Sequence, residues 1–295
     1  MKQKFRGSIS LLAATLIWGS AFIAQSVGMD HIGPFTFQAI RCGLAVIFLI
    51  LLSFVFDKGN FKVFSAKWAD PKLWKAGVLC GCALFVAASL QQVGLVYTDA
   101  GKAGFLTAMY IVLVPVLGLF LKQKPPKSTL FSVILAVAGL YLLSCMGVSE
   151  INKGDLLIMG CALAYALQIT CIDRLASDLD GVRLNCVQAL VVTVISIPFM
   201  FFTETVEMHS ILICWLPLCY AGILSMGVAY TLQIVGQKAL EPAPAALIMS
   251  LESVIAALCG WLILKETMTV TELLGCGLVF AAVILSQLPE KNTVA

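Results

Sequence analysis

Long apolar runs recur along this sequence, separated by short connections that carry most of the charged residues. A helix needs about 20 apolar residues to cross the hydrocarbon core of a bilayer. We expect such spans near residues 8–28, 35–56, 74–96, 103–121, 129–146, 155–173, 184–202, 211–235, 243–264 and 270–288. The first run is too long for the apolar region of a signal peptide, so we keep it as a span. The sequence therefore predicts an all-α polytopic membrane protein with ten transmembrane helices.

The composition excludes most classes of soluble protein. The chain is 60% hydrophobic and 12% charged, whereas a soluble domain is about half apolar and a quarter charged. So few charges cannot cover a water-facing surface, which excludes soluble enzymes, disordered tails and nucleic-acid-binding modules. Ten spans of about 20 residues leave roughly nine residues for each connection, so no soluble domain fits between them.

The basic residues are distributed unevenly over the two ends of the predicted spans. With a cytoplasmic N-terminus, 15 of the 19 lysines and arginines fall in cytoplasmic segments, three fall outside, and Arg41 lies within a span. The cytoplasmic set comprises Lys2, Lys4, Arg6, Lys58, Lys62, Lys67, Lys72, Lys75, Lys122, Lys124, Lys127, Arg174, Arg183, Lys238 and Lys291, and the external set comprises Lys102, Lys153 and Lys265. This bias follows the positive-inside rule. It predicts a cell-membrane protein with both termini in the cytoplasm and with His31 and His209 outside.

The eleven cysteines lie in or beside the apolar runs, and no C-x-x-C motif occurs. They are Cys42, Cys80, Cys82, Cys145, Cys161, Cys171, Cys186, Cys214, Cys219, Cys259 and Cys276. Free cysteine commonly behaves as a small buried hydrophobe. We therefore interpret them as packing residues and expect no metal or redox site.

The two halves of the sequence resemble each other. Residues 89–94, Ser-Leu-Gln-Gln-Val-Gly, align with residues 231–236, Thr-Leu-Gln-Ile-Val-Gly, at an offset of 142. The same offset pairs Tyr110 with Glu252. Earlier in each half the offset is 147, and it pairs Trp18 with Tyr165 and Arg41 with Gln188. Because five spans reverse the direction of insertion, we predict two inverted five-helix repeats, in residues 1–147 and 154–289. Secondary transporters are often built this way, with the substrate site near the midplane between the repeats.

Two ionisable residues lie inside predicted spans. Arg41 lies roughly 9 Å and Glu252 roughly 14 Å from the nearer end of its helix, at 1.5 Å per residue. A charge at depth costs about 2.5–3.5 kcal/mol, so each side chain is expected to face protein or a water-filled cavity. Arg41 would bind a carboxylate, and Glu252 would bind an amine or carry a proton. The alternatives are that the two pair with each other, that they cap backbone carbonyls, or that Arg41 extends outward to the membrane surface.

Neutral polar and aromatic residues accompany these two in both halves. Met226, Tyr230, Gln233 and Gln237 share one helix face by their spacing, and Trp18, Phe22 and Gln25 share another. Each alone is explained by hydrogen bonds between helices, worth about 0.6 kcal/mol. Together they indicate an amphipathic cavity. The candidate substrate-binding residues are Trp18, Phe22, Gln25, Arg41, Gln91, Tyr110, Tyr165, Gln168, Tyr230, Gln233 and Glu252, with Thr107 beside them.

Several local motifs resemble those of the EamA-type permeases of the drug/metabolite transporter superfamily. They are Trp18-Gly19-Ser20-Ala21-Phe22, Arg41, the segment Ala100-Gly101-Lys102-Ala103-Gly104-Phe105-Leu106-Thr107 with Pro115 after it, and the segment from Leu251-Glu252-Ser253-Val254 to Leu264-Lys265-Glu266. The family often has Pro in place of Ser253 and Gly in place of Lys265. The resemblance covers nearly the whole chain. It implies ten helices in two inverted halves, and the export or uptake of small metabolites such as amino acids.

The sequence offers no machinery for ATP hydrolysis. Gly101-Lys102-Ala103-Gly104 lacks the upstream glycine and the strand of a P-loop, and no hydrolase motif occurs. An intramembrane enzyme would need a second deep catalytic group beside Glu252, so we expect no catalytic residues and no cofactor.

We predict a gradient-driven permease, monomeric or homodimeric, with a small-molecule substrate and the bilayer as its partners. The hypothesis is export of an amino acid or related zwitterion, with protons coupled through Glu252 as it meets and leaves Arg41. The alternatives are a lipid-carrier flippase and an importer of a small organic solute.

Overall fold

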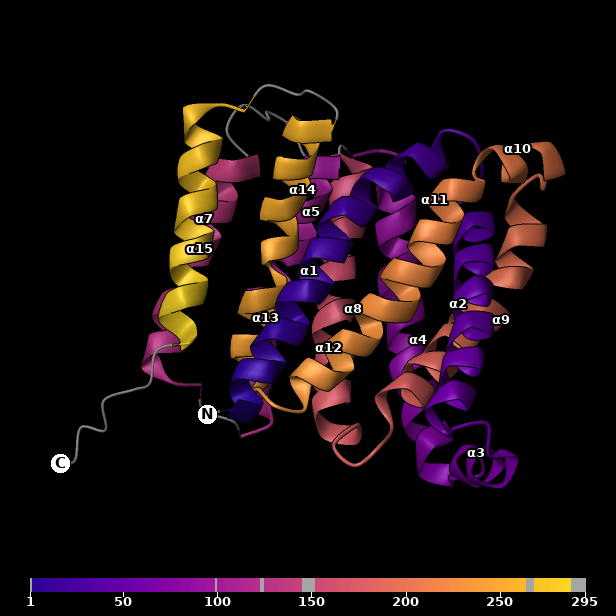
Figure 1. Ribbon diagram of the computed structural model, residues 1–295. Helices are drawn as coiled ribbons and strands as arrows, with labels where there is room; N and C mark the ends of the chain where they lie inside the picture. The colour runs from indigo at the N-terminus through magenta and orange to yellow at the C-terminus, as the bar shows by residue number, and fades with distance from the viewer. Residues whose placement is uncertain (1, 99, 123–124, 145–151, 264–267, 288–295) are drawn as a thin grey trace.

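The computed structural model describes residues 2–98, 100–122, 125–144, 152–263 and 268–287, and every regular element in these ranges is a helix (Figure 1). The first half contains α1 (Lys2–Met29), α2 (Pro34–Phe56), α3 (Phe61–Trp68), α4 (Pro71–Gly94), α5 (Ala100–Ala108), α6 (Tyr110–Phe120) and α7 (Lys127–Ser144). The second half contains α8 (Lys153–Leu175), α9 (Gly181–Thr203), α10 (Met208–Ile213), α11 (Trp215–Cys219), the π-helix η1 (Tyr220–Ala229), α12 (Tyr230–Gln237), α13 (Pro242–Met249), α14 (Leu251–Ile263) and α15 (Val270–Gln287).

The prediction of an all-helical membrane protein is confirmed. In the described ranges, nine helical stretches are long and apolar enough to cross a bilayer, and Lys127–Leu143 adds a shorter apolar helix. Apolar side chains such as Ile134, Val194 and Ile284 are exposed on the outer surface of the bundle, where lipid replaces water as the solvent. Residues 145–146, 264 and 288 of the predicted spans lie outside the described residues, as does Cys145.

Several helix boundaries differ from the prediction. α1 begins at Lys2 rather than at residue 8, so the basic N-terminal residues continue the first span as a helix. The short helix α3 was not predicted; the side chain of Asn60 caps it by accepting hydrogen bonds from the backbone N–H groups of Lys62 and Val63. The predicted span 211–235 begins in a separate helix, α10, and its central part is η1.

Two predicted spans, 103–121 and 243–264, are each divided into two helices. One break lies at Met109, whose N–H bonds to the carbonyl of Leu106, three residues back. The other lies at Ser250, whose hydroxyl donates to the carbonyl of Leu247 at 2.8 Å. Such side-chain bonds to the preceding turn bend helices. By the offset of 142, Ser250 is equivalent to Ala108, the residue before Met109. The spans of the two halves are therefore broken one residue apart in the repeat.

The repeat is visible in equivalent contacts. Gln38 donates to Ser89 Oγ at 2.9 Å, and Asn185 donates to Thr231 Oγ1 at 3.1 Å; these pairs are related by the offsets of 147 and 142. The close crossing of α1 and α12 corresponds in the same way to that of α8 and α4. At the first crossing Gly236 lies against Gly7 and Leu11, and at the second Gly94 lies against Gly154 and Ile158.

The segments that the charges assign to one compartment gather at one end of the molecule. α3 and the starts of α1 and α9 lie there (Figure 1), and Ser8 donates to Gln287 Oε1 at 3.2 Å, which places the end of α15 beside α1. We call this the basic end. α10 lies at the opposite end. The assignment of the basic end to the cytoplasm stays a prediction.

α2 and α9 form an antiparallel pair that is joined at both ends by carboxylates. At the basic end, Asp57 follows α2 and bonds to Arg183 in the first turn of α9 and to Lys67 at 2.6 Å. At the opposite end, Glu204 follows α9 and accepts from the backbone N–H groups of Phe35 at 2.7 Å and Thr36 at 2.8 Å. Asp57 and Glu204 are themselves equivalent at the offset of 147.

The ten cysteines in the described ranges are free, and six of them are buried: Cys42, Cys80, Cys161, Cys186, Cys214 and Cys276. Cys82 is exposed on α4, so the expectation that the cysteines pack in the interior is wrong at that position.

Candidate substrate-binding site

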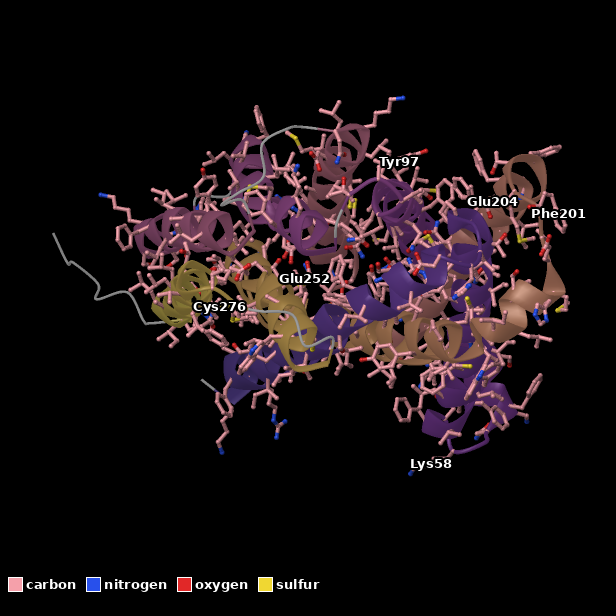
Figure 2. The ribbon with its side chains drawn as sticks, turned by 90° about the horizontal axis from the view of Figure 1, so that it is seen from above. Lys58, Tyr97, Phe201, Glu204, Glu252 and Cys276 are labelled. Atoms are coloured by element: carbon pink, nitrogen blue, oxygen red, sulfur yellow. The ribbon has the colours of Figure 1, made fainter. Side chains whose placement is uncertain are left out.

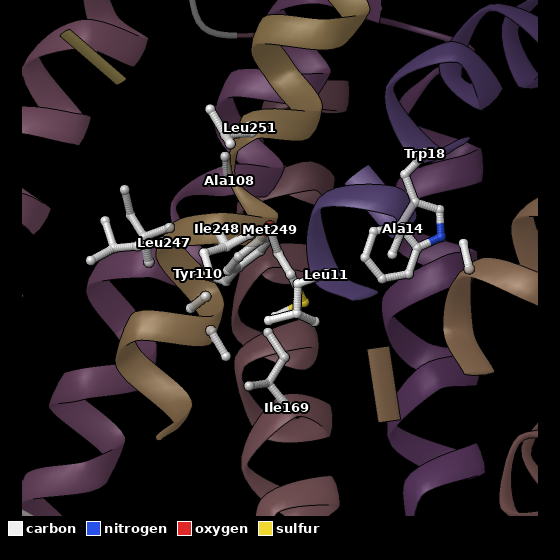
Figure 3. Packing of buried hydrophobic residues seen from close by; sticks show 14 of the residues in the cluster. Leu11, Ala14, Trp18, Ala108, Tyr110, Ile169, Leu247, Ile248, Met249 and Leu251 are labelled. Atoms are coloured by element: carbon white, nitrogen blue, oxygen red, sulfur yellow. The ribbon is translucent and has the colours of Figure 1, made fainter. Parts of the chain in front are cut away.

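A cavity lies between the two halves, and side chains from seven membrane-spanning segments line it. Ten of the eleven candidate residues line it: Trp18, Phe22, Gln25, Arg41, Gln91, Tyr110, Tyr165, Tyr230, Gln233 and Glu252. The remaining lining residues are Thr107, Ile169, Ser225 and Met249. Figure 3 shows Trp18, Tyr110, Ile169 and Met249 within the same buried cluster, so part of the lining belongs to the main hydrophobic core.

Most of the lining consists of equivalent positions from the two halves. Five pairs are related by the offsets of 147 and 142: Trp18 with Tyr165, Phe22 with Ile169, Gln91 with Gln233, Thr107 with Met249, and Tyr110 with Glu252. Because both members of each pair line the cavity, these residues surround the axis that relates the two halves. The cavity therefore lies at the centre of the inverted repeat, which is where transporters of this architecture bind their substrates.

Glu252 and its equivalent Tyr110 are in contact. The Tyr110 hydroxyl donates to Glu252 Oε1 at 3.1 Å, and both side chains are buried. Each residue follows the break in its span, Tyr110 as the first residue of α6 and Glu252 as the second of α14. Seen from above, Glu252 lies in the interior of the bundle, whereas Lys58 and Phe201 lie on its rim (Figure 2).

Arg41 is held inside the bundle. Its Nη1 donates to Gln25 Oε1 at 2.7 Å, its guanidinium lies 5.7 Å from the Phe37 ring centroid, and the residue is only 5% exposed. The interpretation that Arg41 extends outward to the membrane surface is therefore wrong. The interpretation that it pairs with Glu252 is also wrong for this conformation, because no ion pair joins these two described residues.

Aromatic side chains form one wall of the cavity. The rings of Trp18 and Tyr230 meet edge to face with centroids 4.9 Å apart, and the hydroxyls of Tyr230 and Tyr165 are 3.1 Å apart. Tyr165 also donates to Gln91 Oε1 at 3.3 Å, and Gln91 Nε2 donates to Thr107 Oγ1 at 3.2 Å. These hydrogen bonds fix the orientation of the wall, and the one from Tyr165 to Gln91 joins the two halves.

Three buried polar atoms of the lining have no hydrogen-bond partner in the part of the chain that the structure describes: Trp18 Nε1, Arg41 Nε and Gln233 Oε1. Buried polar groups are nearly always paired with protein or with ordered water. Two donors and one acceptor are therefore available to a bound molecule.

Gln168 is the one candidate that the structure places outside the lining. It is fully buried behind Gln233, from which it accepts a hydrogen bond at 3.2 Å, and it donates to Gln188 Oε1 at 3.1 Å. Met226 and Gln237, which share the predicted helix face, are likewise buried outside the lining.

The sequence interpretation missed Ile169, Ser225 and Met249. Ile169 and Met249 are equivalent to Phe22 and Thr107, so applying the repeat to every candidate would have found them. Ser225 carries no such signal, because its equivalent is Ala83. Among the described residues no three His, Cys, Asp or Glu side chains are grouped in a way that would hold a metal ion.

An all-helical membrane bundle of two inverted halves, with a polar cavity at its centre, defines a membrane transporter. The chain belongs to the EamA-like transporter family, which matches residues 5–145 and 152–288. It is a multi-pass membrane protein and not an enzyme.

Individual relatives support this assignment along the whole chain. An uncharacterized transporter of Archaeoglobus fulgidus is 33% identical over 288 residues, which cover 97% of this chain and 87% of the relative. The threonine/homoserine exporter RhtA of Escherichia coli is 28% identical over 297 residues, which cover 96% of this chain and 92% of the exporter. A protein of known crystal structure matches with a TM-score of 0.78 at 15% identity, over 95% of this chain and 96% of that one, which shows likeness of fold.

Proposed function

We propose that the protein is a secondary transporter that exports a small zwitterionic metabolite, an amino acid or a related amine, from the cytoplasm. The central cavity binds the substrate and opens alternately to the two sides of the cell membrane. Both termini and the basic end face the cytoplasm, as the distribution of lysine and arginine favours.

The observation that supports this proposal most is the separation of one buried base from one buried acid. Arg41 and Glu252 line the same cavity, yet Arg41 bonds to Gln25 and Glu252 to Tyr110 rather than to each other. A buried charge is costly unless it is paired, so an ion pair between them would be the expected arrangement in a purely structural site. A zwitterion supplies both missing partners, its carboxylate to Arg41 and its ammonium to Glu252.

The unpaired atoms fit the same substrate. Trp18 Nε1 and Arg41 Nε are donors suited to a carboxylate, and Gln233 Oε1 is an acceptor suited to an ammonium group. The Trp18–Tyr230 wall offers an apolar surface and aromatic faces for the rest of the molecule. RhtA, which matches almost the full length of this chain, is an exporter of threonine and homoserine, which are small zwitterions.

Glu252 is proposed to couple transport to protons. A carboxylate that is buried away from any cation in one conformation and approached by Arg41 in another would bind a proton in the first and release it in the second. The sequence contains no motif for ATP hydrolysis, so we propose that a proton gradient or a substrate gradient drives transport.

The test is counterflow in proteoliposomes that contain the purified protein, with a radiolabelled panel of amino acids, amines, neutral sugars and dicarboxylates. We expect exchange of zwitterions and of related amines, but not of neutral sugars or dicarboxylates. Arg41→Gln should raise the half-saturating concentration for zwitterions by about 10–100-fold, the usual effect of losing hydrogen bonds between charged groups, and should affect amines without a carboxylate much less.

Counterflow restricted to sugars or polyanions would overturn the substrate class. Uptake into right-side-out vesicles without uptake into inverted ones would overturn export and leave import by the same site. Movement of lipid-linked substrates alone would favour a flippase.

A further inference from the structure

Three glutamines form a hydrogen-bonded chain that leads from the cavity into the second half. Gln233, which lines the cavity, donates to Gln168 Oε1 at 3.2 Å, and Gln168 donates to Gln188 Oε1 at 3.1 Å. All three are at least 98% buried. The chain ends at Gln188 Nε2, a buried donor without a hydrogen-bond partner among the residues described. The proposed site makes no use of this amide in the conformation observed.

Gln188 occupies the position in the second half that Arg41 occupies in the first. Arg41 lies seven residues after the first residue of α2, and Gln188 lies seven residues after the first residue of α9. Because α2 and α9 run antiparallel, Arg41 lies about 10 Å from the opposite end of its helix pair and Gln188 about 10 Å from the basic end. The two residues are therefore at mirrored depths.

The lining of the cavity is not fully symmetric between the two halves. Four lining residues have equivalents that do not line it: Gln25, Arg41, Ser225 and Tyr230, whose equivalents are Ile172, Gln188, Ala83 and Ala88. Alternating access moves one half of an inverted repeat against the other around the site. We take this movement to exchange the surroundings of equivalent residues when the cavity turns to the other side of the membrane. The four equivalents then become lining residues, and Gln188 is the polar member among them.

We infer that Gln188, supported by Gln168, is a second, uncharged subsite that holds the carboxylate of the substrate when the cavity faces the basic end. This inference rests on the proposed function and adds to it a difference between the two sides. At the opposite end the carboxylate is held by a charged guanidinium, and at the basic end by a neutral amide in a wider space, because Ala88 replaces Tyr230. Binding from the basic end is therefore weaker and tolerates larger side chains.

The experiment measures half-saturating concentrations for a zwitterionic substrate separately from each side, in right-side-out and inverted membrane vesicles. Gln188→Met keeps the length of the side chain but removes the donor. It should raise the value measured from the basic end about tenfold, the usual effect of one lost hydrogen bond to a charged group, and should change the value from the opposite end less than twofold. Arg41→Gln should show the larger effect from the opposite end.

Gln92→Met is the matched control. Gln92 is also fully buried on a spanning helix, with both amide atoms unpaired in the described part of the structure, but it does not line the cavity and its equivalent is the apolar Ile234. Gln92→Met should change neither half-saturating concentration. The comparison therefore distinguishes the loss of a binding subsite from the loss of a buried amide. Gln188→Glu, of the same shape, should weaken binding from the basic end further by repelling the carboxylate.

An equal change from both sides in Gln188→Met, or no change from either side, would overturn the second subsite while leaving zwitterion transport intact. Failure of the unmodified protein to transport any zwitterion would instead overturn the proposed function, and the subsite with it.

Discussion

The two halves of the protein share a scaffold but carry different charges at equivalent positions. Gly7 with Gly236 and Gly154 with Gly94 make the same close crossing, whereas Arg41 is matched by Gln188 and Glu252 by Tyr110. A site between identical halves would present every group twice. Here the first half supplies one base and the second half supplies one acid to the lining of the cavity. The proposed zwitterionic substrate would use one group of each charge.

The largest expected effect follows from exchanging the acid for a group that cannot titrate. Glu252→Gln keeps the volume and the hydrogen bond from Tyr110. It should abolish accumulation driven by a pH gradient, while substrate exchange persists at saturating substrate concentrations. Tyr110→Phe, the change at the equivalent position, should leave accumulation within about threefold, as expected for one neutral hydrogen bond. Both are measured by radiolabelled flux in proteoliposomes. Undiminished accumulation by Glu252→Gln would show that Glu252 is structural.

The second comparison is between the two ends of the α2–α9 pair, where Asp57 binds side-chain cations and Glu204 binds backbone N–H groups. Asp57→Asn leaves Arg183, which is 1% exposed in its side chain, with Asp180 as its remaining anionic partner among the residues described. It should lower the melting temperature in detergent by several degrees. Glu204→Gln should lower it less, because an amide oxygen still accepts from the start of α2. Equal losses at both ends would contradict this difference.

The same pair predicts a pH dependence. The hydrogen bond from Lys67 and the charges of Arg183 and Lys67 hold the pKa of Asp57 below its ordinary value of 3.8, although burial opposes them. A carboxyl whose pKa is lowered by folding stabilises the protein above its unfolded pKa, and this stabilisation is lost as the pH falls through the folded value. The melting temperature should therefore fall below about pH 4 in the unmodified protein more steeply than in Asp57→Asn. Parallel curves would show that Asp57 contributes nothing to acid stability.

The glycine crossings should respond alike, because they belong to the shared scaffold. A Cβ at Gly236 would lie 2.6 Å from Leu11 Cγ, and one at Gly94 would lie 2.5 Å from Ile158 Cδ1. Alanine at either position should destabilise by about 1–3 kcal/mol through overpacking. Gly277→Ala is the control, since apart from its own stretch of helix no described part of the protein lies within 4 Å of a Cβ there. Destabilisation at one crossing only would show that the halves pack less alike than the repeat indicates.

The smallest effect on the protein is expected from reporter cysteines that test its orientation. Lys62→Cys in α3 and His209→Cys in α10 occupy exposed positions at the basic and opposite ends, so neither should alter stability in a cysteine-free background. An impermeant maleimide should label position 209 but not position 62 in intact cells. The reverse pattern would place the basic end outside.

The sequence determined the architecture and most of the candidate site. Apolar runs show where helices cross the membrane because insertion depends on the local free energy of transferring each segment. The cost of burying a charge likewise identified Arg41 and Glu252 as residues that must face the interior. Together with the repeat, this was enough to find ten of the cavity's lining residues.

Only the tertiary structure decided how these side chains are paired. The rotation and bending of each helix set the distances between side chains on different spans, and neither is a local property of the sequence. This is why Gln168 lies behind Gln233, why Arg41 bonds to Gln25 instead of reaching Glu252, and why the breaks at Met109 and Ser250 were not foreseen. A run of apolar residues indicates that it crosses the membrane, but the partner of each polar group depends on which helix packs beside it.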